Sequence, residues 1–477
     1  MFEPDGGNVD PSGVTHAYAA GARLLGAEIE RFCPVTGTEA QPDGSWIVRT
    51  EKGDIHTQWV VNAAGLWGRE VAAMAGLSLP LQPTEHQYFV LFDDDLDRIM
   101  ENVMRAIDRV PVAAEAGVKR VINGPMIWSP DSNALFGPVP ELRNYFCCNG
   151  IIPGFSQSGG LGLLAAQWMI EGEPEWDMFA WDLARFGDWA DKAFTKARVR
   201  DQYMHRFKIH FPNEERAAGR PAMTRPAYEM QRGMGAVFGL NAGWEHPLWF
   251  ADAPGTEDTN GFARQNWFEP VGREAAMLRD AVGVIDISNF GKYEVTGPGA
   301  GDWLDALVAN HVPREIGKSC LTPLIGMRGG VAGDFTITMT GDESYMMIGS
   351  GMAERYHRRF FDMVPLPDGT GFEVATPRIA GFNVAGPRSR EMLAGLTDAD
   401  LSNEGWRFMR SRRIAVGGVD CLAIRVSFTG DLGWELHCAV DDQVVLYETL
   451  LEAAAAHGGG PVGGRALGAL RIEKGYG

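Results

Sequence analysis

Two stretches of the chain have the order strand, small-residue turn, helix, and this order limits the fold more than any other pattern. The apolar run at residues 59–67 ends in small residues and leads into a helical pattern at 70–74. A second run at 145–150 continues through a glycine-rich turn at 158–162 into another helix. Repeated units of this kind are typical of a doubly wound α/β fold, in which the turns face a nucleotide.

Beyond residue 267 the pattern changes to short strands and helices without strict alternation, which predicts an α+β domain. Breakers at 211–215 and 220–221 place a linker or boundary between about residues 175 and 235. Local signals also predict a helix that starts at Asp10 and Pro11, a short strand at 27–30, a helical segment at 176–206 and a helix at 443–456. A chain of 477 residues also needs several domains, because single hydrophobic cores stop growing near ~250–300 residues. We therefore expect an α/β plus α+β multidomain protein.

Charge and cysteine usage narrow the range of partners. The net charge of −19 argues against binding to nucleic acid or to an anionic membrane surface. There is no apolar run of about 18 residues to span a membrane and no basic start of a signal peptide. The cysteines form no C-x-x-C pair, and the histidines show no zinc-ligand spacing. We expect a cytoplasmic protein without a metal site.

The C-terminal half carries several motifs in a fixed order. They lie at residues 279–288, 291–298, 329–334, 386–390, 425–435 and 470–475. In sequence and order they resemble the aminomethyltransferase (T-protein) fold of the glycine cleavage system. This resemblance implies a folate-binding domain over residues 263–477.

Two further sets of motifs extend the resemblance to the rest of the chain. One set resembles the central domain of dimethylglycine and sarcosine dehydrogenases, at 211–215, 235–239, 243–251 and 264–268. The other resembles the later part of that family's FAD-dependent amine-oxidising domain, at 60–67, 81–88 and 123–162. The resemblance implies a partial FAD-dependent domain at 1–175 and a central domain or linker at 176–262.

The same resemblance assigns residues to the flavin side. The positions implied to line FAD are Val35, Gly65, Trp67, Ile152, Pro153, Gly154, Phe155, Ser156 and Gln157. A helix N-terminus beside a flavin stabilises the negative charge of the reduced ring and raises its electron affinity. His86 matches the family's active-site histidine, which can tune the proton of a substrate amine by hydrogen bonding.

On the folate side, Asp334 matches a carboxylate that takes the proton of the folate nitrogen that attacks an electrophilic carbon. Glu435 matches the residue that holds the pterin ring, because a carboxylate can pair with adjacent amino groups through two parallel bonds. The residues implied to flank the ring are Ile348, Gly349, Ser350, Phe428, Leu436 and His437.

Several positions depart from the family pattern. The first 175 residues hold no Gly-x-Gly-x-x-Gly turn for the FAD pyrophosphate, so the chain as given is expected to bind FAD weakly or not at all. Family strands are expected to be missing between Leu91 and Arg109, where a helical stretch is predicted at 96–110, and the last motif is expected to be incomplete. Phe428, Leu321 and Leu467 stand where the family has Tyr, Tyr and Arg, which predicts altered folate binding.

Three functions stay open at this point. The favoured one is FAD-dependent oxidation of an N-methylglycine-type amine, dimethylglycine or sarcosine, with transfer of the carbon to tetrahydrofolate. Its electrons would pass to oxygen or to an electron-accepting flavoprotein. The second is a folate-dependent, aminomethyltransferase-like one-carbon transferase or binding module with a degenerate flavin domain. The third is an inactive fragment.

Overall fold

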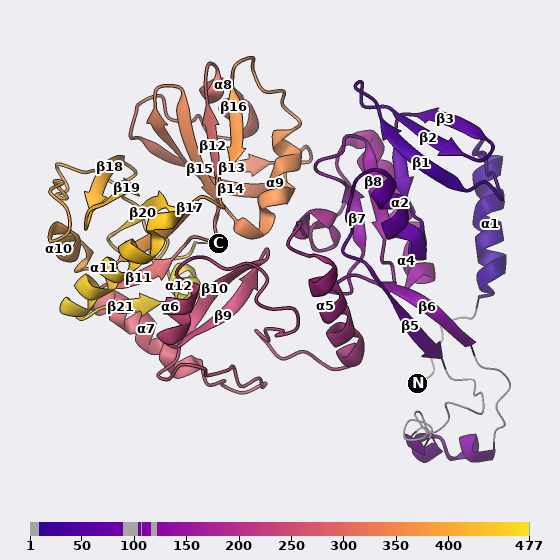
Figure 1. The fold of residues 1–477 in the computed structure, drawn as a ribbon, viewed down its shortest axis with the longest axis horizontal. Coiled ribbons are helices and arrows are strands. Elements are labelled where there is room, and N and C mark those ends of the chain that lie inside the picture. The colour runs from indigo at the N-terminus through magenta and orange to yellow at the C-terminus, as the bar shows by residue number, and fades with distance from the viewer. Residues whose placement is uncertain (1–8, 89–103, 106, 116–121, 477) are drawn as a thin grey trace. The chain divides into compact units, whose positions relative to one another are not determined.

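The computed structural model describes residues 9–88, 104–105, 107–115 and 122–476. The chain divides into two compact units (Figure 1). Unit 1 comprises Met1–Ala165 with Arg198–Gln202, and unit 2 comprises Ala166–Ala197 with Tyr203–Gly477. Helices α4 (Gly154–Glu171) and α5 (Lys192–His205) contribute residues to both units. The three domain boundaries expected from the sequence stay a prediction.

Unit 1 contains three small sheets, with strand orders β1-β2-β3, β4-β8-β7 and β5-β6. Strands β4 and β8 run parallel, which fits two neighbouring strand–turn–helix units. The elements are α1 (Pro11–Leu24), β1 (Val35–Ala40), β2 (Trp46–Thr50), β3 (Gly53–Thr57), β4 (Val60–Asn62), η1 (Gly65–Trp67), α2 (Gly68–Met74), β5 (Gln82–Tyr88), η2 (Pro111–Glu115), β6 (Ile122–Trp128), β7 (Leu135–Pro138), β8 (Tyr145–Asn149) and α4 (Gly154–Glu171).

Local signals account for some ends of these elements and not for others. Helix α1 begins as predicted, because the Asp10 carboxylate accepts a hydrogen bond from the N–H of Gly13 at 2.7 Å. Helix α4 corrects a prediction, since it begins at Gly154 and the glycines at 159–162 lie inside it. Glycine disfavours a helix by only about 1 kcal/mol, so the rest of the helix overrides it. A strand predicted at 27–30 does not form, because these residues are exposed and no strand pairs with them.

Unit 2 contains a two-stranded sheet (β10-β9), a six-stranded sheet (β18-β19-β20-β17-β11-β21) and a five-stranded sheet (β13-β14-β15-β12-β16). Besides parts of α4 and α5, its elements are η3 (Phe179–Trp181), η4 (Leu183–Arg185), α6 (Tyr228–Gly233), β9 (Ala236–Asn241), β10 (Trp244–Phe250), α7 (Phe268–Asp280), β11 (Gly283–Asp286), β12 (Gly291–Thr296), α8 (Ala300–Leu307), β13 (Ser319–Ile325), β14 (Val331–Gly341), β15 (Ser344–Gly349), η5 (Gly351–Ala353), α9 (Glu354–Phe361), β16 (Gly371–Val374), β17 (Ile379–Ala385), α10 (Ser389–Ala394), β18 (Ser411–Val416), β19 (Val419–Ile424), β20 (Gly433–Ala439), η6 (Val440–Asp442), α11 (Gln443–Ala456), β21 (Gly460–Val462) and α12 (Gly464–Glu473). This mixture of strands and helices confirms the predicted α+β character.

The two large sheets of unit 2 each carry helices on one face and meet each other on the other face, where α7 and α12 also cover the β11 and β21 end of the six-stranded sheet. On the six-stranded sheet, the rings of Phe382 in β17 and Tyr447 in α11 stack with centroids 4.8 Å apart. On the five-stranded sheet, Phe335 of β14 packs with residues of α8 and α9. Between the sheets, Ile348 of β15 and Ile424 of β19 belong to one apolar cluster. Helix, sheet, sheet and helix therefore form successive layers (Figure 1).

The segment at 176–206 was predicted to be helical, and the structure corrects this prediction. Only α5 is a regular helix there, preceded by the two short turns η3 and η4. The aromatic residues pack on one another instead, as in the edge-to-face contact of Trp189 with Phe194 at 5.0 Å. Helix α11, by contrast, has the predicted bounds. Across the described ranges, no helix is long and apolar enough to cross a membrane.

Candidate functional site

A cavity of about 260 Å³ lies where the two large sheets of unit 2 face each other. Asp334 and Ile348 line it from the five-stranded sheet, and Asn383 and Glu435 line it from the six-stranded sheet. The other lining residues are Asn241, Ile287, Phe290, Leu321, Thr336, Gly349, Ser350, Gly351, Met352, Phe428, Leu467 and Arg471. The fold thus brings both predicted folate-side carboxylates into one cavity, together with Ile348, Gly349, Ser350 and Phe428.

Strand alternation places the two carboxylates on the cavity side. In β14, Phe335 is fully buried toward the helices, so its neighbour Asp334 faces the other way. In β20, Leu436 packs in the core beneath α11, so Glu435 faces the cavity. Asp334 is exposed, whereas only 12% of the Glu435 side chain is accessible. The same alternation turns the Leu436 side chain into the core, and its predicted place beside the ligand stays a prediction.

His437 lies behind Glu435 rather than beside the cavity. Its ring is buried, and Nε2 is 3.4 Å from Oε2 of Glu435, at ion-pair range. Within the described part of the chain, neither ring nitrogen has a hydrogen-bond partner. Burial lowers the pKa of His437, so the ring is neutral at pH 7. The structure thus places the His437 ring next to Glu435, and its predicted role beside the pterin ring stays a prediction.

Two buried cations fix a loop that carries two lining residues, Ile287 and Phe290. The ammonium of Lys292, fully buried in β12, donates to the carbonyls of Ile287, Ser288 and Phe290 at 3.2, 3.1 and 3.0 Å. The guanidinium of Arg225 also donates to the Ser288 carbonyl, at 3.0 Å. Burial lowers the pKa of Lys292 to about 7 and that of Arg225 to about 10.

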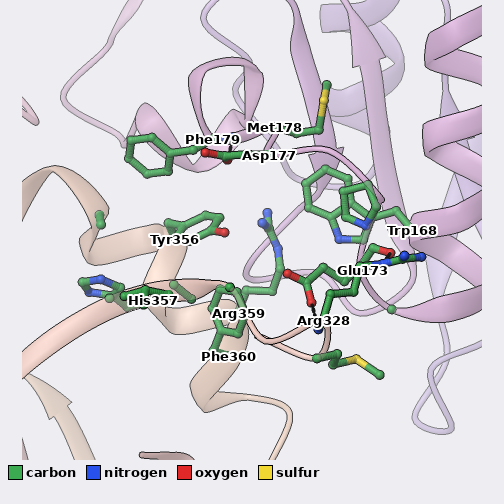
Figure 2. Close-up of a pocket in the computed structure, with 18 of the residues that line it drawn as sticks. Trp168, Glu173, Asp177, Met178, Phe179, Arg328, Tyr356, His357, Arg359 and Phe360 are labelled. Carbon is green, nitrogen blue, oxygen red and sulfur yellow. Dashed lines mark hydrogen bonds between the residues drawn. The ribbon is translucent and has the colours of Figure 1, made fainter. Parts of the chain in front are cut away.

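A second cavity of unit 2, of about 640 Å³, borders the first at Ser350 and reaches Gly333, the residue before Asp334. Figure 2 shows Tyr356, Trp168 and Phe179 around it, with Arg359 between them. The guanidinium carbon of Arg359 lies 5.0 Å from the Trp168 ring centroid, and its charge is paired with Asp182. The larger cavity therefore reaches the backbone next to Asp334 from outside the sheet interface.

His357 lies on the wall of this larger cavity and is fully buried. Its Nδ1 lies 3.0 Å from the Tyr293 hydroxyl, at hydrogen-bond distance. Burial lowers the pKa of His357 to about 4, so the ring is neutral at pH 7. A side chain at Gly333 would collide with its Nε2 at 2.6 Å, so glycine is needed where the backbone passes this ring. Among the described residues, no cluster of acidic, histidine and cysteine side chains could hold a metal ion.

The residues implied to line FAD all belong to unit 1. Val35 begins β1, Gly65 begins η1, and Trp67 in η1 is 66% exposed. Gly154, Phe155, Ser156 and Gln157 form the first turn of α4, after Ile152 and Pro153. The N–H groups of such a turn have few partners within the helix and fit the electron-rich edge of a flavin.

His86 lies in β5, where it pairs with Gly124 of β6. Its side chain is outside the described residues, as is most of the helical stretch predicted at 96–110.

Sequence reasoning missed four polar lining residues, Asn241, Thr336, Asn383 and Arg471. Arg471 lies in α12 four positions after Leu467, so the two side chains share a helix face. The spacing of four residues was the available signal. It places Arg471 at the cavity one helical turn after Leu467, the position where the family has an arginine. Asn383 sits in an apolar strand and gave no signal, because only the paired strand β20 shows what it faces.

The fold defines a protein of two compact units, with a cavity between two facing sheets of unit 2. The family model for the GCVT N-terminal domain matches residues 227–477, more than half of the chain. The models for FAD dependent oxidoreductase and for its central domain match residues 1–97 and 171–224. The chain belongs to the dimethylglycine and sarcosine dehydrogenase family, which combines these three parts.

Three individual proteins show the degree of likeness. Mitochondrial dimethylglycine dehydrogenase of Mus musculus is 33% identical over 542 residues, covering 100% of this chain and 62% of that protein. Mitochondrial sarcosine dehydrogenase of Homo sapiens is 29% identical over 575 residues, covering 100% and 63%. The glycine cleavage system aminomethyltransferase T of Bartonella henselae has a TM-score of 0.44 at 24% identity, covering 53% of this chain and 63% of that structure.

The chain spans about 62% of the length of the first of these relatives. Their match also extends over more positions than the 477 residues of this chain, so the relatives carry residues within the matched region that are absent here. The names of both dehydrogenases place those proteins in mitochondria. The cytoplasmic location of this chain stays a prediction.

Proposed function

We propose that the chain is part of an FAD-dependent enzyme that oxidises an N-methyl group of dimethylglycine or sarcosine and passes the carbon to tetrahydrofolate. The observation that carries this proposal is the cavity between the facing sheets, where Asp334 and Glu435 lie on opposite walls. The activities named for the related dehydrogenases support the oxidative half. Electrons would leave through oxygen or an electron-accepting flavoprotein.

The two carboxylates have different roles in this proposal. Glu435, at the enclosed side of the cavity, accepts hydrogen bonds from neighbouring N–H groups of a pterin ring. Asp334, at the exposed side, takes the proton from the folate nitrogen as that nitrogen attacks the one-carbon donor. Lys292 and Arg225 keep the loop at 287–290 in place, so the cavity is preorganised for its ligand.

On the flavin side, FAD would accept the hydride that leaves the N-methyl group. The first turn of α4, Gly154–Gln157, would hold the flavin's electron-rich edge through its N–H groups. His86 would hydrogen-bond the substrate amine and keep it neutral, because only a neutral amine donates hydride readily. Substrate, FAD and folate are thus assigned to separate sets of residues.

A second candidate is a folate-dependent one-carbon transferase or binding module that works without flavin. One observation favours it: every residue that lines the 260 Å³ cavity belongs to unit 2. Tetrahydrofolate could then bind whether or not unit 1 holds FAD. The two candidates differ in whether added FAD produces a bound chromophore.

Two titrations of the purified chain test these proposals. Calorimetry with tetrahydrofolate should show binding for the wild type and weaker binding for Glu435→Ala. Asp334→Ala should still bind tetrahydrofolate in this titration but fail to transfer carbon in an activity assay. Added FAD should give a protein-bound absorption band near 450 nm. Folate binding without that band selects the second candidate. No heat with tetrahydrofolate rejects both, and a melt without a cooperative transition would instead identify an inactive fragment.

A further inference from the structure

Asn383 is a buried amide whose hydrogen bonds are incomplete. Its side chain lines the 260 Å³ cavity from β17 and is 1% exposed. Nδ2 faces the carbonyls of Val426 and Trp434, each at the long distance of 3.4 Å. Among the residues that the structure describes, no donor reaches Oδ1. Because buried polar atoms in folded proteins are nearly always paired, this oxygen points to a partner that is not part of the chain.

The position of Asn383 in the sheet shows what that partner must offer. Asn383 of β17 is directly opposite Glu435 of the antiparallel strand β20. Side chains at directly opposed positions share one sheet face, with Cβ atoms about 4.5–5.5 Å apart. The Asn383 amide and the Glu435 carboxylate are therefore neighbours at one wall of the cavity, where Oδ1 of Asn383 is a buried acceptor. A ligand with adjacent N–H groups would satisfy both.

We propose that Asn383 and Glu435 together form an acceptor edge that selects ligands carrying a 2-aminopyrimidinone-type ring. This inference rests on the proposed function and adds a specificity-determining residue to it. Glu435 takes two neighbouring N–H groups, and Asn383 Oδ1 takes the next N–H, from the exocyclic amino group. The hydrogen bonds of Nδ2 are long and hold the amide only weakly. The χ2 angle of asparagine varies over a broad range, so a small rotation about this bond brings Oδ1 to the ligand.

A second amide supports the acceptor character of the cavity. Asn241, at the end of β9, also lines it, and its buried Oδ1 likewise has no hydrogen-bond partner within the described ranges. Asp334 and Glu435 add carboxylates from opposite walls. A ligand rich in N–H donors would pair with these side-chain oxygens. A ligand rich in carbonyl groups would instead place acceptor against acceptor at several points.

The test compares two ligands on two variants by calorimetry, using the purified chain. The ligands are tetrahydrofolate and its 2-desamino-2-methyl analogue, which lacks the exocyclic amino group. Asn383→Leu keeps the side-chain size and removes the acceptor. We expect it to weaken tetrahydrofolate by about 3- to 10-fold, the range for one hydrogen bond, and to leave the analogue's affinity unchanged. Leu321→Ala, which changes the shape of the cavity without an acceptor, should weaken both ligands by the same factor.

The outcomes separate this inference from the function on which it rests. Equal losses for both ligands in Asn383→Leu, or no loss for tetrahydrofolate, overturn the role of Asn383 and leave the proposed function standing. No binding of tetrahydrofolate by the wild type overturns both. If Asn383→Leu does not fold, Asn383→Ala takes its place: a loss for tetrahydrofolate that the analogue does not share supports the acceptor edge, and equal losses overturn it.

Discussion

The side chains in and near the cavity differ mainly in their solvent exposure. Asp334 is exposed and Glu435 nearly enclosed, while Lys292 and Asn383 are fully buried. A buried charged side chain is stabilised only by the groups that contact it. Replacing it with a neutral side chain of equal size therefore tests its role directly.

Glu435→Gln keeps the side-chain shape and removes the negative charge. We expect the dissociation constant for tetrahydrofolate to rise about 10- to 100-fold, because hydrogen bonds to a charged acceptor are worth roughly 1.5–3 kcal/mol. Calorimetric titration measures this change. The control is Glu448→Gln on the exposed side of α11, which should bind as the wild type does. Unchanged binding in Glu435→Gln would remove Glu435 from the site.

Lys292 predicts a pH dependence of stability. Its folded-state pKa of about 7 lies below the value of 10.5 that an exposed lysine has. Between these values the unfolded chain holds a proton that the folded protein has released, so the free energy of unfolding rises with pH. Urea denaturation of wild type at pH 7, 8 and 9 should show this rise. In Lys292→Met the slope should be smaller over the same window, whatever the stability at pH 7; equal slopes would contradict the prediction.

A buried carboxylate on α7 helps to hold the start of helix α12, besides the apolar packing of that helix. Glu274 of α7 accepts hydrogen bonds from the backbone N–H of Phe250 at 2.7 Å and of Gly463 at 2.8 Å. Gly463 directly precedes α12, which carries Leu467 and Arg471 into the cavity. The contact therefore links β10, α7 and α12, and the site depends on it.

Glu274→Gln should loosen this link. An amide in place of the carboxylate directs a donor at one of the two N–H groups, so we expect a loss of about 1–3 kcal/mol in the free energy of unfolding. Weaker tetrahydrofolate binding should accompany it. Glu269→Gln, on the exposed side of the same helix, should stay within about 0.5 kcal/mol of the wild type. Burial raises the pKa of Glu274 to about 7, so the denaturation is measured at pH 8, where the carboxylate is ionised.

The molecule as a whole consists of two compact units with separate cores. Separate cores unfold as separate cooperative steps unless a large apolar interface couples them. Differential scanning calorimetry should therefore resolve two transitions. Tetrahydrofolate should raise only the transition of unit 2, which contains every lining residue of the 260 Å³ cavity. A single transition that shifts as a whole with the ligand would show that the units unfold together.

The sequence by itself determined the elements with strong local signals and the family. Helix α1 follows from Asp10 and Pro11, helix α11 from its run of helix-forming residues, and the parallel pair β4 and β8 from two strand–turn–helix patterns. Motif order also named Asp334 and Glu435. Local periodicity and capping suffice for such features, because they act within a few residues.

Only the tertiary structure decided which of these residues share a site. The start of α4 at Gly154 and the irregular segment before α5 depend on packing that overrides local preference. Leu436 and His437 adjoin Glu435 in the sequence, yet alternation turns one into the core and burial places the other behind the carboxylate. Asn383 lies opposite Glu435 through strand register, and Arg471 reaches the cavity through the placement of α12. Such long-range pairings are set by how sheets and helices stack, and no local pattern contains that information.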